Sequence, residues 1–271
     1  MDIPVAIAII IGAAVLAVLV MALVRRIFPG PLLIEPTRGT PMTTVVGTAF
    51  AVLLAFITFA AFQTYNGAKS GAQQEAVATL ELARSAQFFP VSQGDELRGD
   101  FVCYGRAVVY QEWPAMRRGT RAPVVDAWIA RYRGVWNRLD LARPREQVGF
   151  SEMLAEARDR TEGRQNRLSE VTPSVPTPLW LALILGGVMA IGIQLAMADR
   201  RERLVVHGAM LAGLAAIVTA GLLLVNFLDH PYQQHTGSIE PTGMRTSLVL
   251  MGELRPAVQP PCTAAGLPLT S

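Results

Sequence analysis

The sequence contains only two cysteines and three histidines among its 271 residues. It also lacks the glycine-rich phosphate loop, the two-histidine helix motif of zinc proteases, the nucleophile elbow and the dinucleotide-binding fingerprint. These absences leave no recognisable set of catalytic or cofactor-binding residues. We therefore expect neither an enzyme nor a bound cofactor.

Long runs of basic residues are also missing. The 24 Lys and Arg residues nearly balance the 21 Asp and Glu residues, so the isoelectric point near 9.2 reflects a net charge of only +3. Because the basic residues form no block or stripe, the sequence does not predict a nucleic-acid-binding protein.

Charge is entirely absent from four long stretches. A helix needs about 20 residues to cross the hydrocarbon core of a bilayer, and each stretch meets that length. This pattern excludes a single water-soluble globule and a disordered chain. It predicts an all-α, multi-pass protein of the cell membrane, in contact with the lipid bilayer, whose four transmembrane helices are Ile3–Val24, Thr44–Gln63, Leu179–Met197 and Val205–Leu228.

The chain divides into four expected parts. Residues 1–65 carry the first two membrane helices and residues 179–228 the other two. Residues 66–178 are expected to form a soluble, extramembrane helical bundle inserted between the second and third membrane helices. Residues 229–271 form a C-terminal tail, and we expect disorder at its end because Pro256–Ser271 is rich in proline and small residues.

Arginines in the two short loops predict the orientation. Short loops rich in Lys and Arg face the cytoplasm, so the bundle and the tail are expected on the extracytoplasmic side. These arginines are Arg25, Arg26 and Arg38 in one loop and Arg200, Arg201 and Arg203 in the other.

Apolar residues recur at three- and four-residue steps within the expected bundle, which is typical of amphipathic helices. Its aromatic residues are therefore interpreted as core. The two clearest stripes are Leu97, Phe101, Tyr104 and Val108, and Val125, Trp128, Ile129, Tyr132, Val135, Trp136 and Leu139.

The histidines and cysteines leave alternatives open. His230 and His235 could share a metal with Asp229, but three ligands spaced so loosely are a weak signal. We favour termination of the fourth membrane helix by Asp229 and Pro231, and predict no metal site. Cys103 and Cys262 are expected to share an oxidising compartment, so they could form a disulfide. The alternative is a buried Cys103 and a free thiol on the tail.

One face of the second membrane helix combines hydroxyl groups and small side chains, and these positions are candidates for lining a pore. Threonine in a membrane helix also commonly bonds its own backbone, which is the alternative explanation. The candidates are Thr44, Thr48, Ala51, Ala55, Thr58 and Phe62.

Phe56 and Phe59, with Phe62, could form a hydrophobic constriction, or they could face lipid or a neighbouring helix. The four stretches contain no Asp, Glu, Lys or Arg, which argues against a proton-coupled transporter. A channel or a structural membrane protein remains.

Small residues recur every four positions in the fourth membrane helix, a spacing that lets helices approach closely in lipid. The predicted packing positions are Gly208, Ala212, Ala216 and Ala220.

Several short motifs, in this order, resemble the bacterial bestrophin-like domain family. They are Gly47–Phe56, Gln74–Ala76, Tyr110–Pro114, Pro178–Trp180 and Leu228–Tyr232. The resemblance implies kinship with bestrophins, which are pentameric anion channels whose second helix lines the pore.

The leading hypothesis is therefore a homo-oligomeric ion channel, conducting anions, with its pore along the second membrane helix. The competing hypothesis is a non-conducting membrane protein whose bundle binds a partner.

Overall fold

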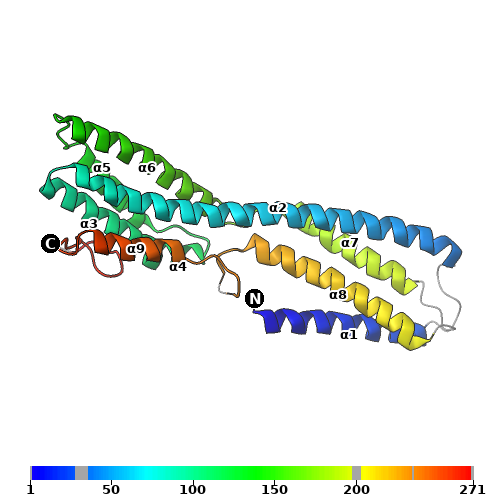
Figure 1. The fold of residues 1–271 in the computed structure, drawn as a ribbon. Coiled ribbons are helices and arrows are strands. Elements are labelled where there is room, and N and C mark those ends of the chain that lie inside the picture. The colour runs from blue at the N-terminus through cyan, green and yellow to red at the C-terminus, as the bar shows by residue number, and fades with distance from the viewer. Residues whose placement is uncertain (1, 28–35, 197–202, 234, 270–271) are drawn as a thin grey trace. The chain divides into compact units, whose positions relative to one another are not determined.

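The computed structural model describes residues 2–27, 36–196, 203–233 and 235–269 (Figure 1). Helices make up the regular structure of these residues. In chain order they are α1 (Ile3–Ile27), α2 (Pro36–Ser85), the short 3-10 helix η1 (Ala86–Phe88), α3 (Val91–Ala107), the π-helix η2 (Val108–Glu112), α4 (Trp113–Met116), α5 (Pro123–Trp136), α6 (Pro144–Ser169), α7 (Thr177–Ala196), α8 (Leu204–Asp229) and α9 (Thr242–Leu254).

The described residues form two compact units. Unit one comprises residues 1–64 and 173–230, and unit two comprises residues 65–172 and 231–271. Among the described residues, four helical segments are long and apolar enough to cross a membrane. They are α1, the segment 41–88 (most of α2 with η1), α7, and α8. The structure confirms the predicted all-α class and provides four candidate membrane-spanning helices.

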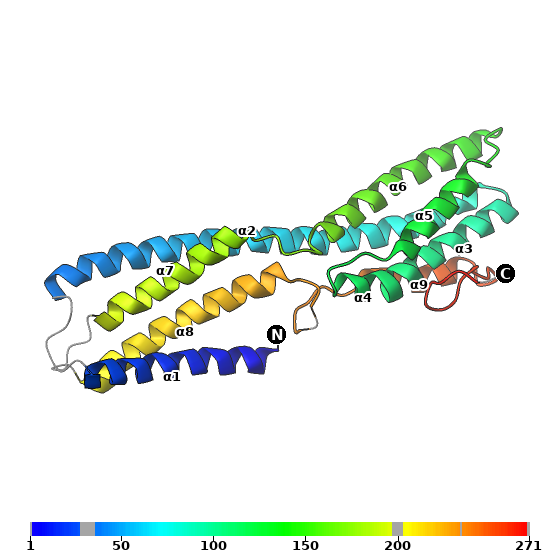
Figure 2. The same ribbon diagram turned by 180° about the vertical axis from the view of Figure 1, so that it is seen from behind.

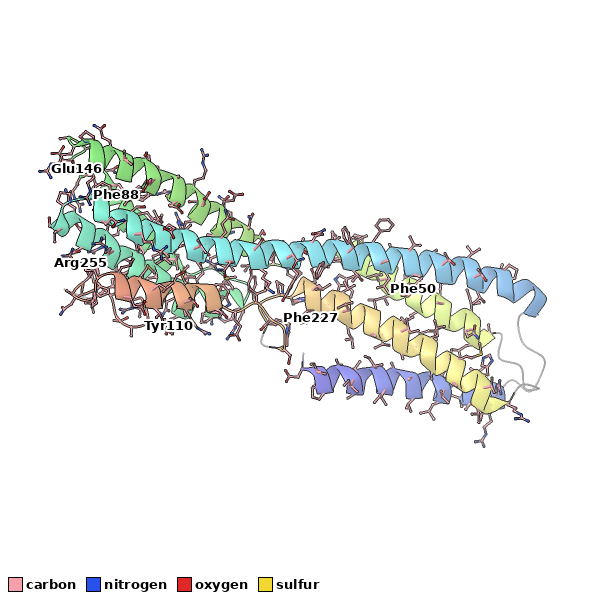
Figure 3. The ribbon with its side chains drawn as sticks, in the orientation of Figure 1. Phe50, Phe88, Tyr110, Glu146, Phe227 and Arg255 are labelled. Atoms are coloured by element: carbon pink, nitrogen blue, oxygen red, sulfur yellow. A yellow bond between two sulfur atoms is a disulfide. The ribbon has the colours of Figure 1, made fainter. Side chains whose placement is uncertain are left out.

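In unit one, α8 lies between α1 and α7, as both views of the ribbon show (Figures 1 and 2). Met21 of α1 packs against Leu211 and Ala215 of α8. On the other side of α8, Val218 and Val225 meet Leu183 of α7, together with Phe50 and Ile57 of α2. Figure 3 labels Phe50 on the side of α2 that lies toward α7.

The predicted packing positions of the fourth membrane helix differ in their burial within one chain. Only Gly208 is buried; Ala212 and Ala216 are half-buried and Ala220 is exposed. The close contacts within the chain fall instead on Leu211, Ala215 and Val218, because α8 turns this neighbouring face toward α1 and α7.

Asp229 joins the end of α8 to the start of α7. Its Oδ1 accepts hydrogen bonds from the backbone N–H groups of Ser174 (2.8 Å) and Val175 (2.9 Å), and its Oδ2 accepts one from Trp180 Nε1 (3.3 Å). The favoured prediction placed Asp229 at the end of the fourth membrane helix, where α8 ends. Among the described residues no group of three His, Cys, Asp or Glu side chains could hold a metal ion.

Unit two is built from the second part of α2, helices α3 to α6 and the C-terminal segment. The buried residues of α3 and α5 include most of the two predicted stripes, as expected for core. These are Leu97, Phe101, Tyr104, Val125, Trp128, Tyr132 and Val135.

The C-terminal segment also packs against this core, which corrects the expected disorder of residues 256–271 as far as Leu269. Helix α9 lies against α3. Trp128 Nε1 donates to the carbonyl of Gly266 (2.8 Å), and the Tyr232 hydroxyl donates to the carbonyl of Arg167 (2.6 Å). Gly266 has φ +77°, and a Cβ there would lie 2.2 Å from the backbone nitrogen of Ala107. Only glycine allows this close approach.

Candidate functional site

The predicted pore face of α2 is directed away from the core of unit one. Thr44, Thr48, Ala51 and Ala55 are exposed, and Thr58 is half-buried. The opposite face carries the packing, through Phe50, Ile57 and Ala61, which are all 8% exposed or less. The face that bears hydroxyl groups is thus left open by the fold of a single chain.

The three phenylalanines of α2 do not share one face. Their side chains are 70%, 61% and 47% exposed at Phe56, Phe59 and Phe62 respectively. At about 100° per residue, Phe62 lies on the hydroxyl-bearing face, Phe59 about 60° from its centre and Phe56 about 120° from it. If that face lines a pore between several copies of the chain, Phe62 points into the pore and Phe56 points away from it.

A buried ionic cluster lies inside unit two. Arg167 of α6 places Nε 2.5 Å from Glu75 Oε2 of α2, and Nη2 2.5 Å from Glu112 Oε2 of η2. Arg164, one helical turn earlier, contacts Glu112 Oε1 at 2.6 Å and Asp126 Oδ1 at 2.6 Å. The Tyr104 hydroxyl donates to Glu75. The cluster therefore ties α2, α3, η2, α5 and α6 together.

Local backbone geometry brings Glu112 into this cluster. The π-helix at Val108–Glu112 widens one turn immediately before α4, and Glu112 at its end is fully buried. Such widened turns are rare and often occur at functional positions. Burial alone would raise the pKa of Glu112, but the guanidinium groups of Arg167 and Arg164 bring it below its ordinary value. Glu112 is therefore ionised over the whole physiological pH range.

Sequence reasoning missed this cluster. Glu75 and Glu112 lie within the family motifs Gln74–Ala76 and Tyr110–Pro114, and the apolar residues on the same helix faces are the available signal. A carboxylate on an otherwise apolar helix face needs a buried partner of opposite charge, because an unpaired buried charge is very costly.

The structure joins Cys103 of α3 to Cys262 of the C-terminal segment by a disulfide. His207 and Gly208, in the first turns of α8, are buried in unit one. The arginine loops are only partly visible, since Arg200 and Arg201 and the side chain of Arg38 lie outside the described residues.

Comparison with known proteins gives one family and one fold. The family model for the Bestrophin-like domain matches residues 11–240. A variant of a bacterial bestrophin homologue from Klebsiella pneumoniae shares 13% identity at a TM-score of 0.68, with 94% of this chain and 98% of that chain covered. Another structure of a bestrophin homologue from Klebsiella pneumoniae shares 12% identity at a TM-score of 0.66, with 93% and 98% covered. No curated protein matches.

Proposed function

The chain belongs to the Bestrophin-like domain family, and from this premise we propose that it is a homo-oligomeric anion channel whose pore is lined by α2. The observation that carries the proposal is the open face of α2, where Thr44, Thr48, Ala51 and Ala55 stay exposed while the opposite face packs. The packing of α2 within one chain uses only the opposite face, so it does not account for the hydroxyl groups on the open face. Around a symmetry axis the same groups line a narrow path for ions.

Phe62 supplies the narrow part of this path. A ring of phenylalanine side chains expels water and closes a pore by dewetting. Phe56 and Phe59, turned progressively away from the axis, then contact the neighbouring copies or the lipid. This division of roles refines the predicted constriction, because the three side chains cannot all face one axis.

Unit two forms the extramembrane part, with helices α3 to α6 inserted between α2 and α7 and the C-terminal segment folded onto them. We place it on the extracytoplasmic side. The arginines of the two short loops support this orientation, and the disulfide between Cys103 and Cys262 supports it independently, because disulfides persist in oxidising compartments. We assign the chain no catalytic activity.

Anion flux from proteoliposomes containing the purified full chain tests the proposal. Liposomes with wild-type protein should release chloride faster than protein-free liposomes. Liposomes with F62A should release it faster still, because the phenylalanine side chains at the constriction are removed. A55L should conduct less because it fills the open face. The matched control is V188L, at an exposed position of α7, which should behave as wild type.

If wild-type protein purifies as a monomer and its liposomes show no anion flux, the proposal of a channel is overturned. The chain would then be a non-conducting membrane protein whose unit two binds a partner.

A further inference from the structure

A groove of about 530 Å³ lies within unit two, between α3, α9 and the C-terminal segment. Pockets for small ligands commonly have volumes of about 300–1,000 Å³. The groove has an apolar floor, and Met251 at its base is only 4% exposed. The other apolar side chains along it include Val102, Leu248, Val249 and Val258.

Four arginines surround this floor: Arg98 and Arg106 from α3, Arg245 from α9 and Arg255 just after it. None of the lining side chains is acidic. Figure 3 labels Tyr110 and Arg255, two of the lining residues, both beside α9.

The carboxylates nearby do not neutralise these arginines. Arg98 and Arg255 share one carboxylate, Asp95, at 3.2 and 3.1 Å. Arg245 lies 3.6 Å from Glu240. Within the part of the chain that the structure describes, these four guanidinium groups therefore form ion pairs with two carboxylates, which leaves an excess of two positive charges.

Two of the arginines keep donors to spare among the described residues. Arg106 has no ion pair there; its Nη1 contacts only the carbonyl of Thr263 (3.4 Å) and the sulfur of Cys262 (3.9 Å). The Nε of Arg98 is buried and has no hydrogen-bond partner in this part of the structure. A buried donor without an acceptor is costly, so the guanidinium group of Arg98 is incompletely paired, and the guanidinium group of Arg106 has donors left for an anion in the groove.

We infer that this groove binds a water-soluble phosphate monoester that carries an apolar group. The dianionic phosphate matches the excess of two positive charges, and guanidinium groups bind phosphate oxygens through paired, charge-assisted hydrogen bonds. The alkyl or aryl group of the ester lies on the floor formed by Leu248 and Met251. The assignment is independent of whether the chain conducts ions.

Calorimetric titration of 1-naphthyl phosphate into the full chain, held in nanodiscs of uncharged phosphatidylcholine, tests the inference. Wild-type protein should bind saturably, and inorganic phosphate should bind at least about tenfold more weakly because it buries no apolar surface. The variant R98Q/R106Q should lose about tenfold or more in affinity. Its matched control, R118Q/R121Q, removes two exposed arginines outside the groove and should bind as wild type.

A second variant guards against a folding defect in the first. V249D places a negative charge at an exposed position of the groove without removing any core side chain, and it should also weaken binding. Each variant should retain the Cys103–Cys262 disulfide and the elution volume of the wild type. If R98Q/R106Q loses the disulfide or elutes differently, the binding affinity of V249D decides whether the groove is the binding site.

Four results would overturn the inference: no saturable binding to wild type, equal weakening by R118Q/R121Q, affinity for inorganic phosphate equal to that for 1-naphthyl phosphate, or unchanged affinity in V249D. Competition by phosphatidic acid built into the nanodisc would assign the groove to a lipid headgroup instead. A change in oligomer size in R98Q/R106Q, without a change in phosphate binding, would assign it to contact with a second copy.

Discussion

Arg167 and Glu112 form an ion pair in which neither side chain reaches solvent, with 2.5 Å between Nη2 and Oε2. Glu75 occupies the other edge of the same guanidinium group, and the ring of Trp113 lies 4.9 Å from its central carbon. Arg167 is thus enclosed on two edges and one face, although it is 92 residues from Glu75 in the chain.

Removal of one member of this cluster should destabilise unit two severely. R167M leaves two buried carboxylates without their main partner, and such a change costs about 3–5 kcal/mol. We expect a large fall in the melting temperature of the purified full chain. The control is R84Q, which breaks the exposed Glu81–Arg84 pair and should change melting little. Equal melting of R167M and wild type would contradict the cluster's role.

Asp100 makes stability depend on pH. Its side chain is fully buried, its Oδ2 has no hydrogen-bond partner among the described residues, and burial raises its pKa to about 6 against the opposing effect of Arg131. The nearby Glu96 also raises the pKa and Arg138 lowers it. Because the folded-state pKa lies above the unfolded-state value, ionised Asp100 opposes folding, and stability falls as pH rises from about 4 to about 6.

D100N should therefore raise the melting temperature by a few degrees at about pH 8 and lose this advantage at about pH 4. Melting curves of both proteins across this range provide the measurement. A D100N protein that is less stable than wild type at about pH 8 would show that the ion pair with Arg131 outweighs the burial of the carboxylate.

The packing of α7 and α8 depends on two glycines. A Cβ at Gly187 would lie 2.7 Å from Val218 Cγ1, and one at Gly221 would lie 2.6 Å from Leu54 Cδ2. G187V should therefore destabilise unit one by about 1–3 kcal/mol through overpacking. G192V, also on α7, meets no atom within 4 Å and should be tolerated. Thermal aggregation of the two variants in the same detergent compares them directly, and equal loss in both would refute this packing.

The disulfide should contribute measurably to the stability of unit two. It joins residues 159 positions apart, and removal of a native disulfide commonly costs about 2–5 kcal/mol. C103S and C262S should lower the melting temperature by similar amounts, and a reductant should lower that of the wild type alone. Mass mapping of the protein without reduction should find Cys103 and Cys262 in one linked peptide. Two free thiols in freshly purified protein would exclude the bond.

The sequence was sufficient where a signal is local. The lengths of the uncharged stretches identified the four apolar helices. The three- and four-residue spacing of apolar residues identified the buried faces of α3 and α5. Both properties depend only on neighbouring positions. The face of α2 that the core leaves open could be drawn from the same periodicity.

Most features that depend on distant residues were not predicted, and the bond between Cys103 and Cys262 was one of two open alternatives. The segment after Arg255 has the composition of a disordered tail, and its order comes from Trp128, Cys103 and the backbone of Ala107, none of which is near it in sequence. The contacts of Leu211 and Ala215 within the chain were not predicted either, because the small residues Ala212 and Ala216 beside them do not reveal which helix the neighbouring face of α8 meets. The buried pairing of Arg167 likewise required three elements to be assembled first.

The bond between Cys103 and Cys262 closes a covalent ring that contains the whole of α7 and α8. The two cysteines can meet only on one side of a membrane, so the chain between them must cross it an even number of times, as two spanning helices do. The ring can also close only after α8 has crossed and the C-terminal segment has emerged beside α3. The oxidised state of this one cysteine pair is therefore a biochemical marker of chains whose membrane insertion is complete.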